Sequence, residues 1–293
     1  MKFSDYLEKI RDIGREVNPD TLAATRALIS PMYAAEDGAG VHVERDVAYG
    51  PDARHRLDVF TPAGSFDPAR PLLVFVHGGG FVAGDKHTEG SPFYSNTGYW
   101  AVRNGFNGVA MTYRLAPACQ WPSGIEDIHK AISYLQENGG SHGISTQRLF
   151  LMGQSAGAAH AAHYVSHAEI YKPHPHGLRG LICLSGLYNF VGYKPGPLEK
   201  AYLGEDSSVY ESRSSLHGLV ASGIPLMITL AEFDPPFFQK QGLELLGAWH
   251  AKHGQLPRFV HAIGQNHLSV ALYFGMAGDL VAPQVKAFIE ANS

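Results

Sequence analysis

The chain has 293 residues, of which 45% are hydrophobic and 17% charged, the composition of an ordinary globular protein long enough to bury a large core. Lys and Arg number 23 against 27 Asp and Glu, a formal net charge of −4 without any basic block, so nucleic acid is not an expected partner. Because no stretch has the length of a membrane span and the N-terminus lacks an apolar signal core, we expect a cytoplasmic protein.

The first 40 residues indicate a separate helical segment. Two helices are predicted within residues 3–35, and they are divided near Asn18-Pro19-Asp20, where a proline suits the first turn of a helix. Both helices precede the first predicted strand. We therefore expect residues 1–40 to form an added layer on a larger unit that spans residues 41–293.

The rest of the chain predicts an α/β fold with a mostly parallel, doubly wound sheet. Two extended runs between Val43 and Phe60 flank Gly50-Pro51-Asp52, which is typical of a tight turn and predicts an antiparallel sheet edge. Buried strands then alternate with helices, and the strands are expected at 72–76, 107–113, 148–152, 178–184, 225–230 and 258–262. The helix after Pro122 has the complementary helical period, with an apolar stripe formed by Ile125, Ile128, Ile132 and Leu135. A polar excursion at 191–222, with helical capacity at 198–203, could cover the site as a lid.

A pentapeptide after the third buried strand has the pattern of a nucleophile elbow. Gly153-Gln154-Ser155-Ala156-Gly157 follows the apolar run Leu149 to Met152 and precedes the helix-forming Ala158-Ala159. A serine at such a sharp turn requires neighbours with almost no side chain two positions away on either side. By itself the pattern also fits an ordinary glycine-rich turn.

A glycine loop follows the first buried strand. His77-Gly78-Gly79-Gly80 begins where the strand at 72–76 ends, and its glycines allow the backbone N–H groups to point at one atom. The oxyanion donors are predicted to be the N–H groups of Gly79, Gly80 and Ala156. We expect His77 to brace this loop rather than to transfer protons.

An acid and a base are expected at the ends of later strands. Asp234 follows the strand at 225–230, and Glu232 is its nearest competitor; a helix N-cap is the alternative role for either. Among 16 histidines, His267 follows the last strand and completes the chain order serine, aspartate, histidine, with His261 as second choice.

Two further groups of residues suggest other chemistry less strongly. His160, His163 and His167 could share one helix face, with His174 and His176 soon after, but no acidic residue interleaves, so a His-rich helix face is preferred to zinc. Cys119 and Cys183 lack a paired spacing and are expected to be reduced thiols. No metal or cofactor is predicted.

Taken together, these motifs resemble the α/β-hydrolase superfamily, in its hormone-sensitive-lipase-like esterase group. The likeness runs from about Val43 to the C-terminus and rests on residues 77–81, Tyr113-Arg114-Leu115-Ala116-Pro117, residues 153–157, Asp234-Pro235 and His267. Gln154 and Ala158-Ala159 differ from that group, in which an acidic residue and Gly-Asn are usual. These differences, and the sequence Ser185-Gly186-Leu187-Tyr188, are closer to the feruloyl-esterase-like and kynurenine-formamidase-like branches.

The resemblance implies a catalytic triad of Ser155, Asp234 and His267, and N-terminal helices that cap an acyl pocket. It also implies short acyl chains rather than triglycerides. The sequence therefore predicts a serine carboxylesterase acting on a small-molecule ester. Residues adjacent to the catalytic positions are candidates for the pocket wall, namely Phe81, Tyr188, Phe237 and Leu268.

An amidase of the aryl-formamidase type would use the same three residues, and a non-catalytic receptor would be expected to lack one of them. The sequence leaves the oligomeric state open, a homodimer included.

Overall fold

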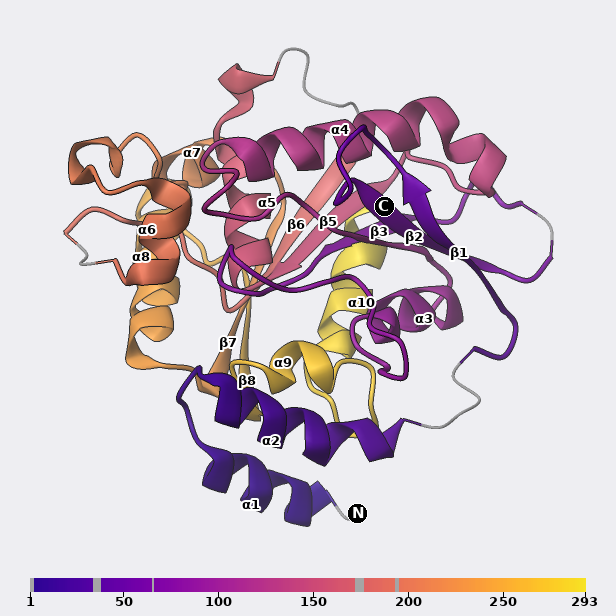
Figure 1. Ribbon diagram of the computed structural model, residues 1–293, viewed down its shortest axis with the longest axis horizontal. Helices are drawn as coiled ribbons and strands as arrows, with labels where there is room; N and C mark the ends of the chain where they lie inside the picture. The colour runs from indigo at the N-terminus through magenta and orange to yellow at the C-terminus, as the bar shows by residue number, and fades with distance from the viewer. Residues whose placement is uncertain (1–2, 34–37, 65, 172–176, 193–194) are drawn as a thin grey trace.

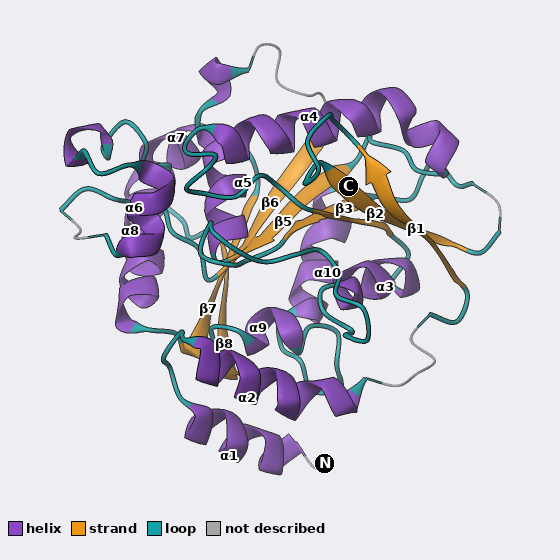
Figure 2. Ribbon diagram, in the orientation of Figure 1, coloured by secondary structure: helices purple, strands orange, loops and turns teal. Residues whose placement is uncertain are grey.

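The computed structural model describes residues 3–33, 38–64, 66–171, 177–192 and 195–293 (Figures 1 and 2). Within these residues eight strands form one sheet in the order β1-β2-β4-β3-β5-β6-β7-β8. The strands are β1 (Val41–Ala48), β2 (Arg56–Pro62), β3 (Leu72–Val76), β4 (Asn107–Met111), β5 (Leu149–Gln154), β6 (Leu178–Leu184), β7 (Leu226–Phe233) and β8 (Arg258–Asn266). The predicted mostly parallel α/β sheet is confirmed.

The antiparallel edge is also where the sequence predicted it. β1 pairs antiparallel with β2, and β2 pairs antiparallel with β4, whereas β3 to β8 pair in parallel. Strands β3 and β5 and the second half of β6 are near-continuous apolar runs, as expected where helices cover both faces of a sheet.

Helices pack on the two faces of the sheet in separate layers (Figure 1). One face packs against α4 (Ser123–Asn138), α5 (Ala156–Ser166), α7 (Leu216–Ala221) and α8 (Pro236–His253). The other face packs against α1 (Phe3–Ile13), α2 (Pro19–Ile29), α3 (Ser95–Arg103), α9 (Ser269–Leu272) and α10 (Ala282–Asn292). The predicted stripe of α4 is buried, with Ile125 and Ile128 at 0% exposure. The excursion at 191–222 contains α6 (Pro197–Leu203) and α7.

The register of the sheet brings the ends of five strands to one edge. Val76 of β3 pairs with Gly153, and Gln154 of β5 pairs with Leu184. Leu184 in turn pairs with Thr229, and Phe233 of β7 pairs with Asn266. The next residues along the chain therefore emerge at the carboxyl edge of the sheet, where ligands bind in open α/β folds.

Four of the buried strands end elsewhere than the sequence predicts. β4 ends at Met111, two residues early, whereas β5 continues to Gln154, β7 to Phe233 and β8 to Asn266. The last two strands pair across Ala231↔Ala262 and again across Phe233↔Asn266, with an irregularity between these pairs. Because pairing resumes after the irregularity, both strands extend beyond their apolar runs, which is why the sequence pattern alone missed their ends.

Candidate active site

Ser155 lies at the sharp turn between β5 and α5, with φ 54° and ψ −119°. This strained left-handed conformation needs room on both sides. A Cβ atom at Gly153 would lie 2.3 Å from the Gly157 carbonyl oxygen, and one at Gly157 would lie 2.1 Å from the Val76 carbonyl oxygen. Both glycines are therefore required for α5 to begin close against β3, and the half-buried Ser155 lies at that junction.

The glycine loop after β3 turns its backbone through three consecutive residues of positive φ, namely Gly79, Gly80 and Phe81. The Gly79 carbonyl accepts hydrogen bonds from Val82 N at 3.2 Å and Ala83 N at 3.0 Å. Because C=O and N–H are antiparallel in a trans peptide, the Gly80 N–H points away from that turn. By the same geometry, the Gly79 N–H points away from the Gly78 carbonyl, which contacts His77 Nδ1 at 2.6 Å.

His77 braces this loop through contacts with Gly78, Arg54 and Tyr113. Its Nδ1 donates to the Gly78 carbonyl, so the unprotonated Nε2 faces the Arg54 guanidinium at 3.3 Å. The ring stacks on Tyr113 with 4.4 Å between centroids, and the Tyr113 hydroxyl donates to the His77 carbonyl at 3.1 Å. Burial lowers the pKa of His77 to about 4. A neutral, fully buried histidine held in this way is structural, as the sequence indicated.

Three polar side chains from the predicted strand ends form a hydrogen-bonded chain. His267 Nε2 lies 2.9 Å from Ser155 Oγ, and His267 Nδ1 lies 2.7 Å from Asp234 Oδ1. Because a carboxylate only accepts, the proton of the neutral imidazole is on Nδ1, and Nε2 is free to accept the serine proton. Asp234 and His267 are buried at 0% and 2% exposure. The arrangement suits transfer of a proton from Ser155 to His267.

A fourth side chain, which the sequence analysis did not single out as a site residue, completes the surroundings of Asp234. Ser185 Oγ donates to Asp234 Oδ2 at 2.7 Å, and the Ala231 N–H donates to the same oxygen at 2.7 Å. Ser185 is fully buried and has φ 50°, so its backbone adopts a conformation that serine rarely takes. Its position directly after β6, at the same sheet edge, is the signal that could have identified it.

The alternative candidates for the acid and the base, Glu232 and His261, lie away from Ser155. Glu232 is inside β7, and its carboxylate accepts the Gly264 N–H at 2.7 Å, which holds β8 in place. His261 is an exposed residue in the middle of β8. The N-cap of α8 is Pro235, so Asp234 does not have the capping role that the sequence left open.

The four predicted pocket residues divide into three groups. Phe81 and Phe237 belong to an apolar cluster next to Ala156, together with Leu187, Phe190, Tyr202 and Phe238. Leu268 is half-buried directly after His267. Tyr188 lies at 1% exposure in the apolar core that includes residues of the sheet, α5 and α8, and its role in a pocket wall stays a prediction.

Two apolar side chains near the site were not predicted. The Phe238 ring lies 4.0 Å from the His267 ring, centroid to centroid. Leu198 of α6 is 46% exposed, and its Cδ1 would lie 2.7 Å from a Cβ atom at Gly80. The excursion at 191–222 therefore places α6 directly against the glycine loop.

The histidines of α5 are packed among aromatic rings. His160 lies 4.4 Å from Tyr113 and 5.2 Å from Phe81, between ring centroids, and burial lowers its pKa to about 3. The part of the chain that the structure describes contains no group of three or more His, Cys, Asp or Glu arranged to hold a metal ion. His174 and His176 lie outside that part. Likewise, no helix among the described residues is long and apolar enough to cross a membrane.

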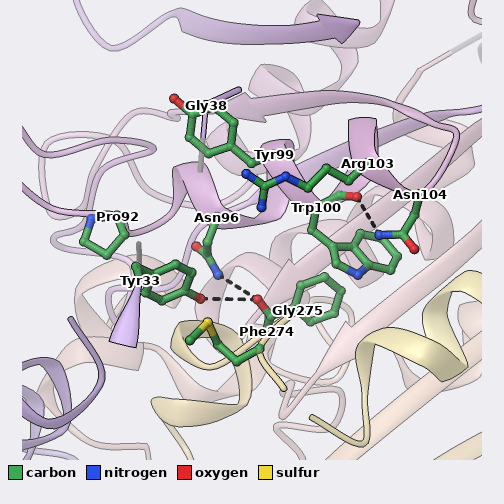
Figure 3. A pocket seen from close by; sticks show the side chains of 11 residues that line it. Tyr33, Gly38, Pro92, Asn96, Tyr99, Trp100, Arg103, Asn104, Phe274 and Gly275 are labelled. Atoms are coloured by element: carbon green, nitrogen blue, oxygen red, sulfur yellow. Dashed lines mark hydrogen bonds between the residues drawn. The ribbon is translucent and has the colours of Figure 1, made fainter. Parts of the chain in front are cut away.

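A cavity of about 430 Å³ lies away from the triad (Figure 3). Its walls are α3 and the segment after α9, with Tyr33 and Gly38 at one side. None of Ser155, Asp234 or His267 lines it. We therefore do not include it in the candidate active site.

Comparison with known proteins supports the same reading of the fold. Residues 57–169, which contain the glycine loop and Ser155 but neither Asp234 nor His267, match the BD-FAE family model. Esterase LipQ of Mycobacterium tuberculosis (strain ATCC 25618 / H37Rv) is 32% identical over 119 residues, 40% of this chain. Isoprenylcysteine alpha-carbonyl methylesterase ICME of Arabidopsis thaliana is 32% identical over 120 residues, 41% of this chain. Each match covers 27% of the length of that relative.

Solved structures match over almost the whole chain. A bacterial heroin esterase superposes with a TM-score of 0.69 at 22% identity, covering 98% of this chain and 96% of its own. Esterase B from Lactobacillus rhamnosis superposes with a TM-score of 0.71 at 18% identity, covering 99% of this chain and 100% of its own. At such low identities these likenesses establish the fold alone. The sheet order, the strained serine after β5 and these likenesses show that the chain has the α/β-hydrolase fold.

Proposed function

We propose that this protein is a serine carboxylesterase that hydrolyses small esters with short-to-medium acyl chains. The observation that carries the proposal is the unbroken chain of contacts from Ser155 Oγ to His267 Nε2 at 2.9 Å and from His267 Nδ1 to Asp234 Oδ1 at 2.7 Å. In these contacts Ser155 is the proposed nucleophile, His267 the base and Asp234 the acid that orients the base, the three groups that ester hydrolysis of this kind needs.

In the proposed reaction, Ser155 attacks the ester carbonyl carbon while His267 takes the hydroxyl proton. Asp234 holds the imidazole in the reactive tautomer and stabilises the imidazolium. The N–H groups of Gly79, Gly80 and Ala156 are the proposed donors to the oxyanion. His267 then gives its proton to the departing alcohol, and a water molecule repeats the cycle to release the carboxylic acid and free Ser155.

The relatives support an ester substrate, because the curated and structural matches described above carry the name esterase. The apolar cluster around Phe81 and Phe237 suits an acyl chain more than a charged group. We also propose that residues 1–40 and the excursion at 191–222 border the substrate pocket of the catalytic unit at 41–293. The contact of Leu198 with Gly80 supports this role for the excursion, since it places α6 beside the proposed oxyanion donors.

Hydrolysis of p-nitrophenyl esters of increasing acyl length tests the proposal, with an aryl formamide measured in parallel. We expect turnover of the esters, greatest for short and medium acyl chains. An organophosphonate should label the wild-type protein at one equivalent and should not label a Ser155→Ala variant. Turnover of the formamide alone would replace the esterase by an amidase, and the absence of both label and turnover would overturn the proposal.

A further inference from the structure

The turn that carries His267 is fixed by its own side chains. Asn266 Oδ1 accepts hydrogen bonds from Leu268 N at 3.1 Å and from Ser269 N at 2.8 Å. Ser269 Oγ in turn accepts from Asn266 N at 2.8 Å. These bonds span His267, so the orientation of Asn266 determines how the turn presents the imidazole to Ser155.

The N-terminal helices hold the two residues that precede His267. The second polar end of the Asn266 amide, Nδ2, donates to Thr25 Oγ1 of α2 at 3.1 Å. The Tyr6 hydroxyl of α1 donates to Gln265 Oε1 at 2.8 Å. Tyr6 and Thr25 are both 0% exposed, and Gln265 and Asn266 are both 2% exposed. Losing a buried hydrogen bond of this kind is costly, because the polar group that remains is left without a partner and cannot bond to water instead.

The same helices also pack closely on both sides of the turn. Before it, Gly264 has φ 72°, and a Cβ atom there would lie 2.0 Å from Leu7 Cδ2, so α1 rests directly on β8. After it, the Tyr6 and Tyr273 rings stack with centroids 4.2 Å apart. The Tyr33 hydroxyl, a few residues after α2, donates to the Leu272 carbonyl at 2.8 Å. It also lies 3.3 Å from the Phe274 carbonyl, a contact drawn in Figure 3.

A bond from the other side completes the support. Gln154, next to the nucleophile, donates from Nε2 to the His267 carbonyl at 2.9 Å. The backbone of His267 is therefore held between the elbow and residues 3–33. We propose that residues 3–33 position the base His267, and that Thr25 and Tyr6 act as positioning residues through Asn266 and Gln265. This inference rests on the proposed function.

A positioning role and a covering role have different kinetic consequences. Loss of a pocket cover changes KM and the relative rates for short and long acyl chains, because it alters substrate contacts. Loss of a positioning contact lowers kcat for all esters alike, since a misplacement of about 1 Å can cost up to about 100-fold in rate. The bonds to Asn266 and Gln265 predict the second pattern.

The test is Thr25→Val in the full chain, which removes the hydroxyl and keeps the branched shape. Thr25→Ser restores the hydroxyl. Thr21→Val is the matched control, because Thr21 lies one turn earlier on α2 and its hydroxyl, among the described residues, bonds only with Glu16 and Asn18 at the start of that helix. Each variant is titrated with an organophosphonate, and kcat per labelled site is measured on p-nitrophenyl acetate and p-nitrophenyl octanoate.

We expect Thr25→Val to lose about tenfold in kcat per labelled site on both esters, with KM unchanged and with slower labelling at full stoichiometry. Thr25→Ser and Thr21→Val should remain within about twofold of the wild type. Tyr6→Phe, which removes only a hydroxyl, should lower kcat in the same way and serves if Thr25→Val does not fold.

Unchanged kcat per labelled site in both Thr25→Val and Tyr6→Phe would overturn the positioning role. A change in KM or in the acetate-to-octanoate ratio, with kcat per labelled site unchanged, would likewise overturn it and leave these helices only the role of bordering the pocket. Failure of the proposed function is distinct from either outcome, because the wild-type protein itself would then neither turn over esters nor be labelled.

Discussion

The two halves of the candidate site are built by different means. The nucleophile half, residues 72–81 and 149–166, is shaped by backbone packing, since glycines at 153 and 157 let α5 touch the end of β3. The acid–base half, residues 226–234 and 258–272, depends on side-chain hydrogen bonds from distant segments. Ser185 donates to Asp234, and Thr25 accepts from Asn266 across a separation of 241 residues.

This difference explains which half is visible in a short stretch of sequence. The BD-FAE match covers residues 57–169, so it includes the whole nucleophile half and excludes the acid–base half. Steric requirements at a tight turn allow few residue types, and they leave a compact motif. A hydrogen bond between remote side chains can be made by several residue types, so it leaves no comparable pattern.

The largest expected effect comes from removing Ser155 Oγ, the proposed nucleophile that both halves of the site surround. Ser155→Ala should lower kcat by about 10⁴-fold or more, because neither the base nor the oxyanion donors can replace the nucleophile. Single-turnover and steady-state assays on p-nitrophenyl acetate measure it. Unfolding curves that match the wild type provide the control, and retained turnover would contradict the mechanism.

Breaking the backbone packing of the nucleophile half should destabilise the fold as well as the site. Gly157→Ala places a methyl group 2.1 Å from the Val76 carbonyl oxygen. We expect a loss of about 3 kcal/mol in the free energy of unfolding, measured by urea denaturation, together with the loss of most activity.

The matched control for that change is Gly247→Ala on α8. A Cβ atom at Gly247 would meet nothing within 4 Å, so alanine there should stabilise the helix by about 0.5–1 kcal/mol. Equal effects of the two alanines would show that crowding at the elbow does not matter.

Acid should weaken the nucleophile half through its buried histidines. Burial lowers the pKa of His160 to about 3 and that of His77 to about 4, while histidine in an unfolded chain titrates near about 6.5. As pH falls below that value, these histidines become protonated in the unfolded chain but stay neutral in the folded one. Stability therefore declines by about 1.4 kcal/mol per pH unit for each such histidine, until pH reaches its folded pKa.

His160→Gln, which cannot titrate, should reduce this acid sensitivity by the contribution of one histidine. Urea denaturation at about pH 7 and about pH 5 measures the difference. His250→Gln on the exposed side of α8 is the control and should leave the slope unchanged. An unchanged slope in His160→Gln would mean that this buried ring does not govern acid stability.

The smallest expected effect tests the polar contacts of the acid–base half. Ser185→Ala removes the hydroxyl that donates to Asp234 Oδ2, while the Ala231 N–H bond to that oxygen remains. We expect about a tenfold fall in kcat with KM unchanged, in line with the loss of one hydrogen bond to a charged group.

Ser141→Ala, which removes an exposed hydroxyl that donates to the nearby Asn138 carbonyl, is the control for Ser185→Ala and should behave like the wild type. A kcat in Ser185→Ala equal to that of the wild type would show that backbone donation alone orients Asp234. The acid–base half would then depend on its side-chain partners less than we infer.

Local sequence patterns were enough to predict most of the architecture. Apolar runs located the centres of β3 to β8, and the apolar stripe after Pro122 located α4. Strand ends were less predictable, because β7 and β8 continue past their apolar runs through pairing with each other. The burial of Tyr188, which was assigned to the pocket from its position in sequence, became visible only in the structure.

What the sequence by itself determined is the order of elements and the identity of the residues that the chain places at strand ends, Ser155, Asp234 and His267 among them. Periodicity and turn chemistry are local, so they can be read without the fold. Only the tertiary structure revealed which remote side chains support those residues: Ser185 at Asp234, and Tyr6, Thr25 and Gln154 around the His267 turn. Such contacts depend on how the helical layers pack on the sheet. The sequence does not reveal them, because a buried polar group bonds to whichever partner the fold brings near it.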